Sequence, residues 1–225
     1  MNLKAKFLFS IGLLGLLCFT LPDWLRADTV TDLNFDSIAV APGGFTDATA
    51  YLNSFGVTFS SSQPGATPLI GNDVGSAITA VSPPNFFIVN PGPGFNNSPL
   101  SYTLTFTTPL DSLSFYEAVL VSNATYPAWT ATAFNGSVPV ASVGQPLQFG
   151  MPAQLYILNG LNITSVTFSS FSTGQTTDNI PIDDLTLVTP GAATPEPSSL
   201  LLLGNGLGFL ALAARSKRQA RRTAC

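Results

Sequence analysis

Polar and apolar residues alternate along several short segments of this chain. In residues 101–110, Tyr102, Leu104 and Phe106 alternate with Thr103 and Thr105. A period of two is the pattern of a β-strand that buries one face. Similar patterns occur at residues 56–61, 85–90, 113–120, 128–134, 163–170 and 182–188. Because no window shows sustained helical periodicity with capping residues, the pattern predicts an all-β domain.

Turn-forming residues separate these segments. Asn135-Gly136 and Asn159-Gly160 are pairs that often close β-hairpins. Pro83-Pro84 and the Pro-Gly-Pro-Gly run at residues 91–94 predict exposed loops rather than central strands. Many short strands joined by such turns indicate an antiparallel β-sandwich, and we expect a jelly-roll-like arrangement.

Aromatic residues supply most of the expected core. The apolar positions of the alternating segments hold Phe59, Phe106, Phe115 and Phe168. Tyr126 and Trp129, on either side of Pro127, allow two interpretations. Core packing is the preferred interpretation, and an exposed platform that stacks on sugar rings is the alternative. In the second case Tyr126 and Trp129 are the candidate carbohydrate-binding residues.

The N-terminus predicts export. Lys4 and Lys6 form a basic start, and residues 7–21 form an apolar run of the length found in secretory signal peptides. We expect residues 1–27 to be the signal peptide, with cleavage after Ala27, and residues 28–190 to be the extracytoplasmic β-sandwich domain. Two alternatives stay open: a lipoprotein modified at Cys18, and an uncleaved membrane anchor.

Charge is divided sharply along the chain. All eight Lys and Arg residues lie at the two ends, with none between Ala27 and Ala214, and the chain contains no histidine. The domain therefore carries acids only. Without His or Cys it cannot build a His-assisted nucleophile or a typical zinc site. Without basic residues it would repel nucleic acid, so we expect no nucleic-acid partner.

Carboxylates are the remaining groups able to perform catalysis. Two carboxyl groups that flank a sugar are enough for glycoside hydrolysis, and Glu117 is the one glutamate of the domain. We interpret Glu117 as a solvated residue at a strand edge in preference to a general acid. The sequence therefore predicts a protein that is not an enzyme, with a carboxylate-based glycoside hydrolase as a less favoured alternative.

The C-terminus has three consecutive parts. Residues 191–197 form a linker that contains Pro195, Glu196 and Pro197. Residues 198–214 contain no charged residue and have the minimum length of a transmembrane helix. Residues 215–225 contain five Lys and Arg residues, and such a basic flank stays in the cytoplasm. We therefore expect an anchor in the inner membrane with the acidic domain outside.

This arrangement resembles the PEP-CTERM sorting signal of exopolysaccharide-producing Gram-negative bacteria. The resemblance covers about the last thirty residues, from the Pro195-Glu196-Pro197 motif through the apolar helix to the basic cluster. It implies that an exosortase-type enzyme recognises the motif and processes the tail. The chain would then be membrane-anchored for a time and afterwards reach the cell surface or the extracellular matrix.

A second resemblance concerns the domain itself. The segments LNFDSI, YLNSFGVTFSS, YTLTFTTPLDSLSF and IPIDDLTL are similar to a jelly-roll type found in exported proteins and carbohydrate-binding modules. The resemblance implies a structural calcium ion held by Asp36 and by Asp183 or Asp184. Calcium is the cation that suits a site made only of oxygen ligands. Since neighbours in a strand point to opposite faces, only one of Asp183 and Asp184 is expected to face the site.

Two functions for the domain follow from these observations. The preferred one is a non-catalytic structural or adhesive protein of the surface or matrix, in contact with exopolysaccharide. The alternative is a carbohydrate-binding module. Ordinary surface acids that keep an exported protein soluble are the competing explanation of the aspartates.

Overall fold

The computed structural model describes residues 27–76, 78–91, 100–120, 125–126, 128–146, 148–149, 153–171 and 180–191. The predicted signal peptide before Ala27, Pro195-Glu196-Pro197, the predicted membrane helix and the basic tail lie outside these residues. Within the described ranges, no helix combines the length and the apolar character needed to cross a bilayer. Residues Asp28–Pro190 form one compact unit.

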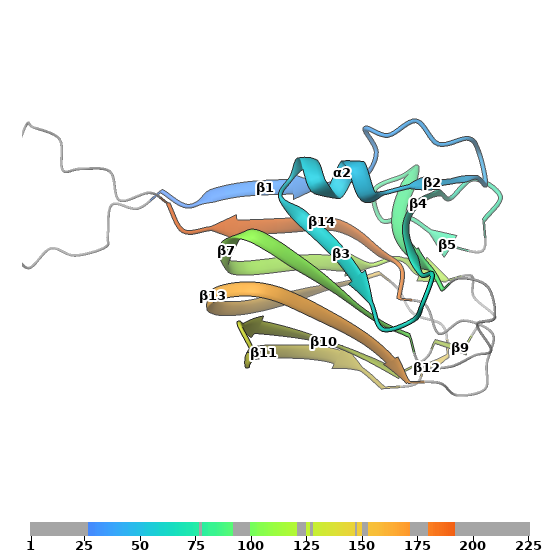
Figure 1. The fold of residues 1–225 in the computed structure, drawn as a ribbon. Helices are drawn as coiled ribbons and strands as arrows, with labels where there is room; N and C mark the ends of the chain where they lie inside the picture. Colours follow the sequence, from blue (N-terminus) through green and yellow to red (C-terminus); the bar gives the residue numbers. More distant parts are fainter. Residues whose placement is uncertain are drawn as a thin grey trace, which may run out of the picture. The chain divides into compact units, whose positions relative to one another are not determined.

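Antiparallel β-strands make up most of the described chain, as the alternating pattern predicts (Figure 1). One short helix, α2, was not predicted. In chain order the elements are β1 (Thr29–Leu33), β2 (Phe45–Asp47), α2 (Thr49–Ser54), β3 (Val57–Ser61), β4 (Thr67–Asn72), β5 (Ile78–Thr79), β6 (Asn85–Asn90), β7 (Ser101–Glu117), β8 (Val119–Leu120), β9 (Thr125–Tyr126), β10 (Ala128–Asn135), β11 (Val138–Gln145), β12 (Gln148–Phe149), β13 (Gln154–Phe171) and β14 (Ile182–Thr189).

The two longest strands, β7 and β13, pair along nearly their whole length and form the centre of the main sheet. Strand order in this sheet is β11-β10-β13-β7-β14-β6-β4-β2, with β1 paired to β14 and β3 paired to β7. Near one end of the β7–β13 ladder Tyr102 pairs with Phe168, and near the other end Phe115 pairs with Tyr156. The rings of Phe115 and Phe168 are nevertheless only 5.1 Å apart. The ladder therefore folds back on itself.

A break in the pairing marks the fold in the ladder. The register shifts between Asn159 and Ile163 and again before Ser165. Asn162 has a φ of 57°, a left-handed conformation that Asn adopts more readily than most residues. Asn159-Gly160, predicted as a hairpin turn, thus lies inside β13 at this bend, whereas Asn135-Gly136 does close the β10–β11 hairpin.

The fold in the ladder creates two layers. One layer contains β3, residues 101–106 of β7, residues 165–170 of β13, β10 and β11. The other contains β1, β14, residues 110–117 of β7 and residues 154–159 of β13. β6, β4 and β2 extend from β14, where Ile182 pairs with Phe87. The predicted antiparallel β class is confirmed, and the jelly-roll connectivity stays a prediction.

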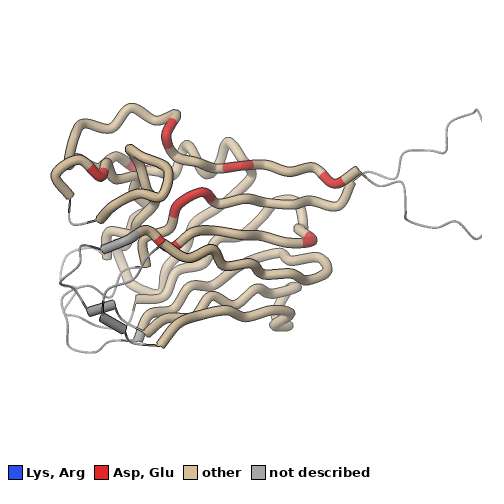
Figure 2. The backbone as a smooth tube through the Cα atoms, turned by 180° about the vertical axis from the view of Figure 1, so that it is seen from behind, with Lys and Arg blue, Asp and Glu red and all other residues tan. Residues whose placement is uncertain are grey.

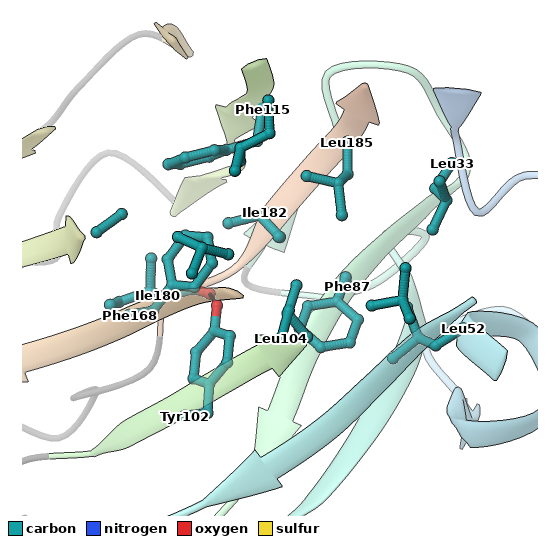
Figure 3. Packing of buried hydrophobic residues seen from close by; sticks show 14 of the residues in the cluster. Leu33, Leu52, Phe87, Tyr102, Leu104, Phe115, Phe168, Ile180, Ile182 and Leu185 are labelled. Atoms are coloured by element: carbon teal, nitrogen blue, oxygen red, sulfur yellow. Dashed lines mark hydrogen bonds between the residues drawn. The ribbon is translucent and has the colours of Figure 1, made fainter. Parts of the chain in front are cut away.

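Apolar side chains from both layers fill the space between them (Figure 3). Of the predicted core residues, Phe106, Phe115 and Phe168 are buried and Phe59 is half-buried. Phe168 stacks on Tyr102 with ring centroids 4.9 Å apart and meets Phe115 edge to face. These contacts join strands that lie far apart in the sequence, so the aromatic cluster holds the two layers together.

Negative charge is confined to part of the folded domain. The described acids lie on β1, β2, β7 and β14 and in loops (Figure 2). By contrast, β3, β10, β11 and β13 contain no charged residue. The uncharged strands β3, β10 and β11 all belong to the same layer, whose outer surface is therefore neutral.

The packing of Phe168 generates the first prediction. Phe168→Ala removes a ring that contacts both layers, so we expect the free energy of unfolding to fall by about 3–5 kcal/mol. Leu161→Ala is the control, since Leu161 is 77% exposed and its loss should change stability by less than about 0.5 kcal/mol. Urea denaturation followed by tryptophan fluorescence measures both. Equal effects of the two changes would contradict this account of the core.

Candidate functional site

Asp183 fixes the loop that precedes β6. Its Oδ2 atom accepts hydrogen bonds from the backbone N–H groups of Val81 and Ser82, at 2.7 and 2.9 Å. Its Oδ1 atom accepts one from the N–H of Asp184 at 2.8 Å. The side chain is fully buried. Asp183 therefore connects β14 to a loop about one hundred residues earlier in the chain.

Asp36 and Asp184 bind the same loop. Ser82 donates its hydroxyl proton to Oδ1 of Asp184 at 2.7 Å, and the N–H of Asn85 donates to Oδ1 of Asp36 at 3.1 Å. The three predicted aspartates thus converge around residues 81–85. The expectation that only one of Asp183 and Asp184 faces this place was wrong.

A β-bulge explains why both neighbours reach the loop. The β7–β14 register shifts between Asp183 and Thr186, and Asp184 has a φ of 47°. A left-handed residue in a bulge interrupts the alternation of side chains along a strand. The sequence pattern assumes regular pleating, so it placed Asp184 on the opposite face from Asp183.

Two amide side chains complete this polar cluster. Asn85, which is buried, donates from Nδ2 to the carbonyl oxygens of Phe35 and Ile38 at 3.0 and 2.8 Å. Asn72 donates from Nδ2 to the carbonyl oxygen of Val40 at 3.3 Å. These bonds hold the irregular chain after β1 against β4 and β6. Neither residue was a predicted site residue, although Asn72 precedes a loop and Asn85 follows one, and Asn is common beside loops.

The structure brings the three aspartates together through hydrogen bonds, and the calcium site implied by the resemblance stays a prediction. Calcium takes six to eight oxygen ligands directed at one point. Both oxygens of Asp183 are engaged by backbone N–H donors, and one oxygen each of Asp36 and Asp184 accepts a further hydrogen bond. Across the described ranges, no group of three or more His, Cys, Asp or Glu residues could hold a metal ion. The carboxylates act here as acceptors that organise a loop.

A second buried polar cluster surrounds Glu117 at the end of β7. Oε1 of Glu117 accepts hydrogen bonds from Nε1 of Trp129 at 2.8 Å and from Nε2 of Gln145 at 2.7 Å. The hydroxyl of Tyr156 donates to Oε1 of Gln145 at 3.1 Å. Residues from β7, β10, β11 and β13 are joined in this way. The cluster connects the two layers of the sandwich.

Burial changes the acidity of both clusters. Loss of hydration raises the pKa of Glu117 from 4.5 to about 7, against the lowering effect of its hydrogen bonds from Trp129 and Gln145. Burial likewise raises the pKa of Asp183 from 3.8 to about 7, although three backbone N–H groups favour its charged form. The pKa of Asp36 is also raised, mainly by burial, with repulsion from Asp184 as a smaller cause.

The interpretation of Glu117 as a solvated residue was wrong. Only 4% of Glu117 is exposed. Glu117 follows Leu113 and Phe115 at intervals of two residues, so all three side chains point to the same, buried side of β7. This alternation in the sequence could have identified Glu117 as buried. A pKa near 7 would suit a general acid, but a carboxyl enclosed by Trp129 and Gln145 is not positioned to meet a polysaccharide.

Trp129 does not form an exposed platform. It is 1% exposed, and its ring lies 4.8 Å from that of Tyr156 and 5.9 Å from that of Phe115. The preferred interpretation of Trp129 as a core residue is confirmed, and its role as a carbohydrate-binding residue is excluded by burial. Tyr126 belongs to β9, but its side chain lies outside the described part.

Comparisons with known proteins give only weak likenesses. No family model matches the chain, and no curated protein matches it. The K1 cleaved adhesin domain of Lys-gingipain from Porphyromonas gingivalis W83 is 11% identical, with a TM-score of 0.43 over 71% of this chain and 97% of that chain. The K2 adhesin domain of Lys-gingipain is 14% identical, with a TM-score of 0.40 over 71% and 99%.

A third similar structure is the family 32 carbohydrate-binding module of C. perfringens NanJ in complex with galactose. It is 13% identical, with a TM-score of 0.36 over 64% of this chain and 98% of that chain. Likenesses with such TM-scores do not indicate a function for this chain.

The raised pKa of Glu117 predicts how stability depends on pH. Because folding raises this pKa from 4.5 to about 7, its contribution is greatest below pH 4.5 and is lost as pH rises to about 7. The loss is on the order of 3 kcal/mol for this group. Glu117→Gln keeps an acceptor for Trp129 and removes the charge, so the pH dependence should become shallower, with the part due to Asp183 remaining.

Denaturant unfolding between pH 4 and pH 8 measures this effect. Stability of the wild type should decline over that range more steeply than that of Glu117→Gln. Identical pH profiles for the two proteins would show that folding does not raise the pKa of Glu117.

Replacing the carboxyl group of Asp183 with an amide should lower the stability of the domain. Three backbone N–H groups donate to the two carboxyl oxygens of Asp183. Asp183→Asn replaces one of these oxygens with an NH₂ group, which cannot accept, so at least one buried N–H loses its acceptor. We expect stability to fall by about 1–3 kcal/mol. Thermal melting measured in calcium and in chelator should show the same loss under both conditions. A loss confined to calcium would instead support the predicted calcium site.

Proposed function

We propose that the protein is an exported, non-catalytic structural or adhesive component of the cell surface or extracellular matrix, processed by an exosortase-type enzyme. The order of the last thirty residues carries this proposal. Pro195-Glu196-Pro197 precedes an uncharged apolar segment, which in turn precedes a basic cluster. A C-terminal sorting signal of this kind acts on exported proteins, and the other end of the chain has the basic first residues and the apolar run of a signal peptide.

The chemistry of the domain supports a role without catalysis. No His, Cys, Lys or Arg lies between Ala27 and Ala214. The two carboxyl groups whose pKa rises to about 7, Glu117 and Asp183, are buried and serve to join strands and loops. A hydrolase would need such groups at a surface that a sugar can reach. The acids therefore support stability and solubility rather than a reaction.

A carbohydrate-binding module with a sugar-stacking platform is the alternative function. The burial of Trp129 removes one of the two aromatic residues on which that alternative depended. An adhesive role does not need a platform of this kind, because extended surfaces bind polymers through many weak contacts.

Processing of the tail is the property to test first. In the native host, Glu196→Ala should leave the C-terminal helix attached and retain the protein in the membrane fraction. The wild type should appear at the surface or in the matrix with a mature C-terminus near Pro195. Asp73→Asn, a change within the domain, is the control that should not affect maturation.

Mass spectrometry of the mature C-terminus and cell fractionation give the result. Surface material that still ends at Cys225 would overturn the proposal of processing. Folding of each variant is checked by circular dichroism, so that a secretion defect is separated from unfolding.

A further inference from the structure

One outer face of the sandwich is covered by hydroxyl groups. It belongs to the layer formed by β3, β10, β11 and the adjoining halves of β7 and β13. In β3, residues 101–106 of β7 and residues 165–170 of β13, the outward positions are Ser or Thr. β10 adds two threonines, and β11 adds Ser142 beside the exposed Val138 and Val140. We call this surface the hydroxyl face; its members are Thr58, Ser60, Ser101, Thr103, Thr105, Thr130, Thr132, Ser142, Ser165, Thr167 and Ser169.

Strand register aligns these hydroxyls in rows across the sheet. One row crosses all five strands, because neighbours in the ladder pair in the order Ser60, Thr103, Thr167, Thr132 and Ser142. Strands lie about 4.8 Å apart, so the row presents a hydroxyl at each of these intervals.

Two further rows flank the first one. Ser101, Ser169 and Thr130 form one of them, and Thr58, Thr105 and Ser165 form the other. Because alternate residues of a strand are about 6.7 Å apart, the three rows make a regular two-dimensional array. Such an array matches a repeating polymer better than a single small molecule.

Hydrogen bonds between side chains fix the positions of these hydroxyls. Oγ1 of Thr103 and Oγ1 of Thr167 are 2.8 Å apart, and the hydroxyls of Ser101 and Ser169 are 3.0 Å apart. A hydroxyl has one proton and two acceptor lone pairs. Each bonded pair uses one proton and one lone pair, so it still has capacity for an outside partner. The face is thus ordered before any ligand binds, which lowers the entropic cost of binding.

The distribution of charge in the domain favours a neutral partner for this face. From Ala118 to Thr177 the sequence contains no charged residue, and this segment supplies β10, β11 and β13. The acids of the described domain lie elsewhere (Figure 2). Without basic residues, the domain has nothing to attract an anionic polymer, and its acids repel one. A cationic partner would prefer the acidic part.

Protein partners fit this face less well than a polysaccharide does. Energetically dominant contacts between proteins are enriched in Trp, Tyr and Arg, and no member of the hydroxyl face is one of these. The rows end at Phe134, which is half-buried beside Ser165. A neutral glycan carries both donors and acceptors at short intervals, as the hydroxyl face does.

We infer that the hydroxyl face binds a neutral, hydroxyl-rich polysaccharide through many dispersed hydrogen bonds. This inference rests on the proposed matrix function and identifies the surface and the class of polymer. Binding through such contacts is weak at each site and becomes firm over an extended chain. No aromatic platform and no metal ion is required.

Retention on insoluble polysaccharides tests the inference with the full-length chain. The probes are cellulose, a neutral mannan and a neutral galactan, with alginate as the anionic comparison. We expect retention on at least one neutral polymer and none on alginate. Thr103→Val combined with Thr167→Val removes two central hydroxyls and keeps β-branched side chains, so retention should weaken about tenfold.

Thr186→Val combined with Thr189→Val is the matched control. Both residues are on β14, in the other layer, and their hydroxyls bond to Asp32 and to the carbonyl oxygen of Thr29. This double variant should bind like the wild type. Melting curves of both variants verify that they fold, and a second pair, Thr132→Val with Ser142→Ala, gives an independent reduction if the first pair unfolds.

Three results would overturn the inference. The first is the absence of retention on every neutral polymer, and the second is equal retention by the Thr103/Thr167 and Thr186/Thr189 variants. The third is that the wild type forms a dimer and the Thr103/Thr167 variant does not. The last result would identify a second copy of the chain as the occupant. If the protein still reaches the matrix with a processed C-terminus in any of these cases, the proposed function stands and only the assignment of the hydroxyl face fails.

Discussion

The fold in the β7–β13 ladder is the constraint on which the rest of the domain depends. Because one continuous pair of strands contributes to both layers, the aromatic residues of its two halves meet across the core. The same fold turns β3, β10 and β11 into one surface and β1 and β14 into the other. Without it, the inward residues of β7 and β13 would lie on one extended sheet with no opposite layer to bury them.

Polar groups have been placed inside this sandwich in two different ways. Asp183 uses both carboxyl oxygens to accept hydrogen bonds from the backbone N–H groups of Val81, Ser82 and Asp184. Glu117 uses one oxygen to join side chains from two other strands. In each case burial favours the neutral carboxyl, while the hydrogen bonds favour the charged one. Burial is the larger effect, so both groups have a pKa near 7, close to the pH at which many environments operate.

The sequence predicted most of this fold where its strands are regular. Alternation in residues 101–110 and 113–120 located both parts of β7, but these were predicted as two segments where the structure has one strand. Asn159-Gly160 suggested a hairpin, because a bend within a strand and a turn between strands use the same residues. At the candidate site, the convergence of the aspartates was predicted. The bulge at Asp184 was not, because it depends on how β14 pairs with β7, and the sequence of one strand does not contain that register.

The pairing of β1 with β14 has a consequence for the order in which the chain can fold. The first and last strands of the domain are neighbours, and Asp183 bonds to the loop at Val81 and Ser82. A ribosome or a translocation channel releases the N-terminus first. β1 must therefore wait, unpaired, until almost the whole domain has emerged. During that interval the acids of the early segments, with no basic residue to attract them, keep the waiting chains apart.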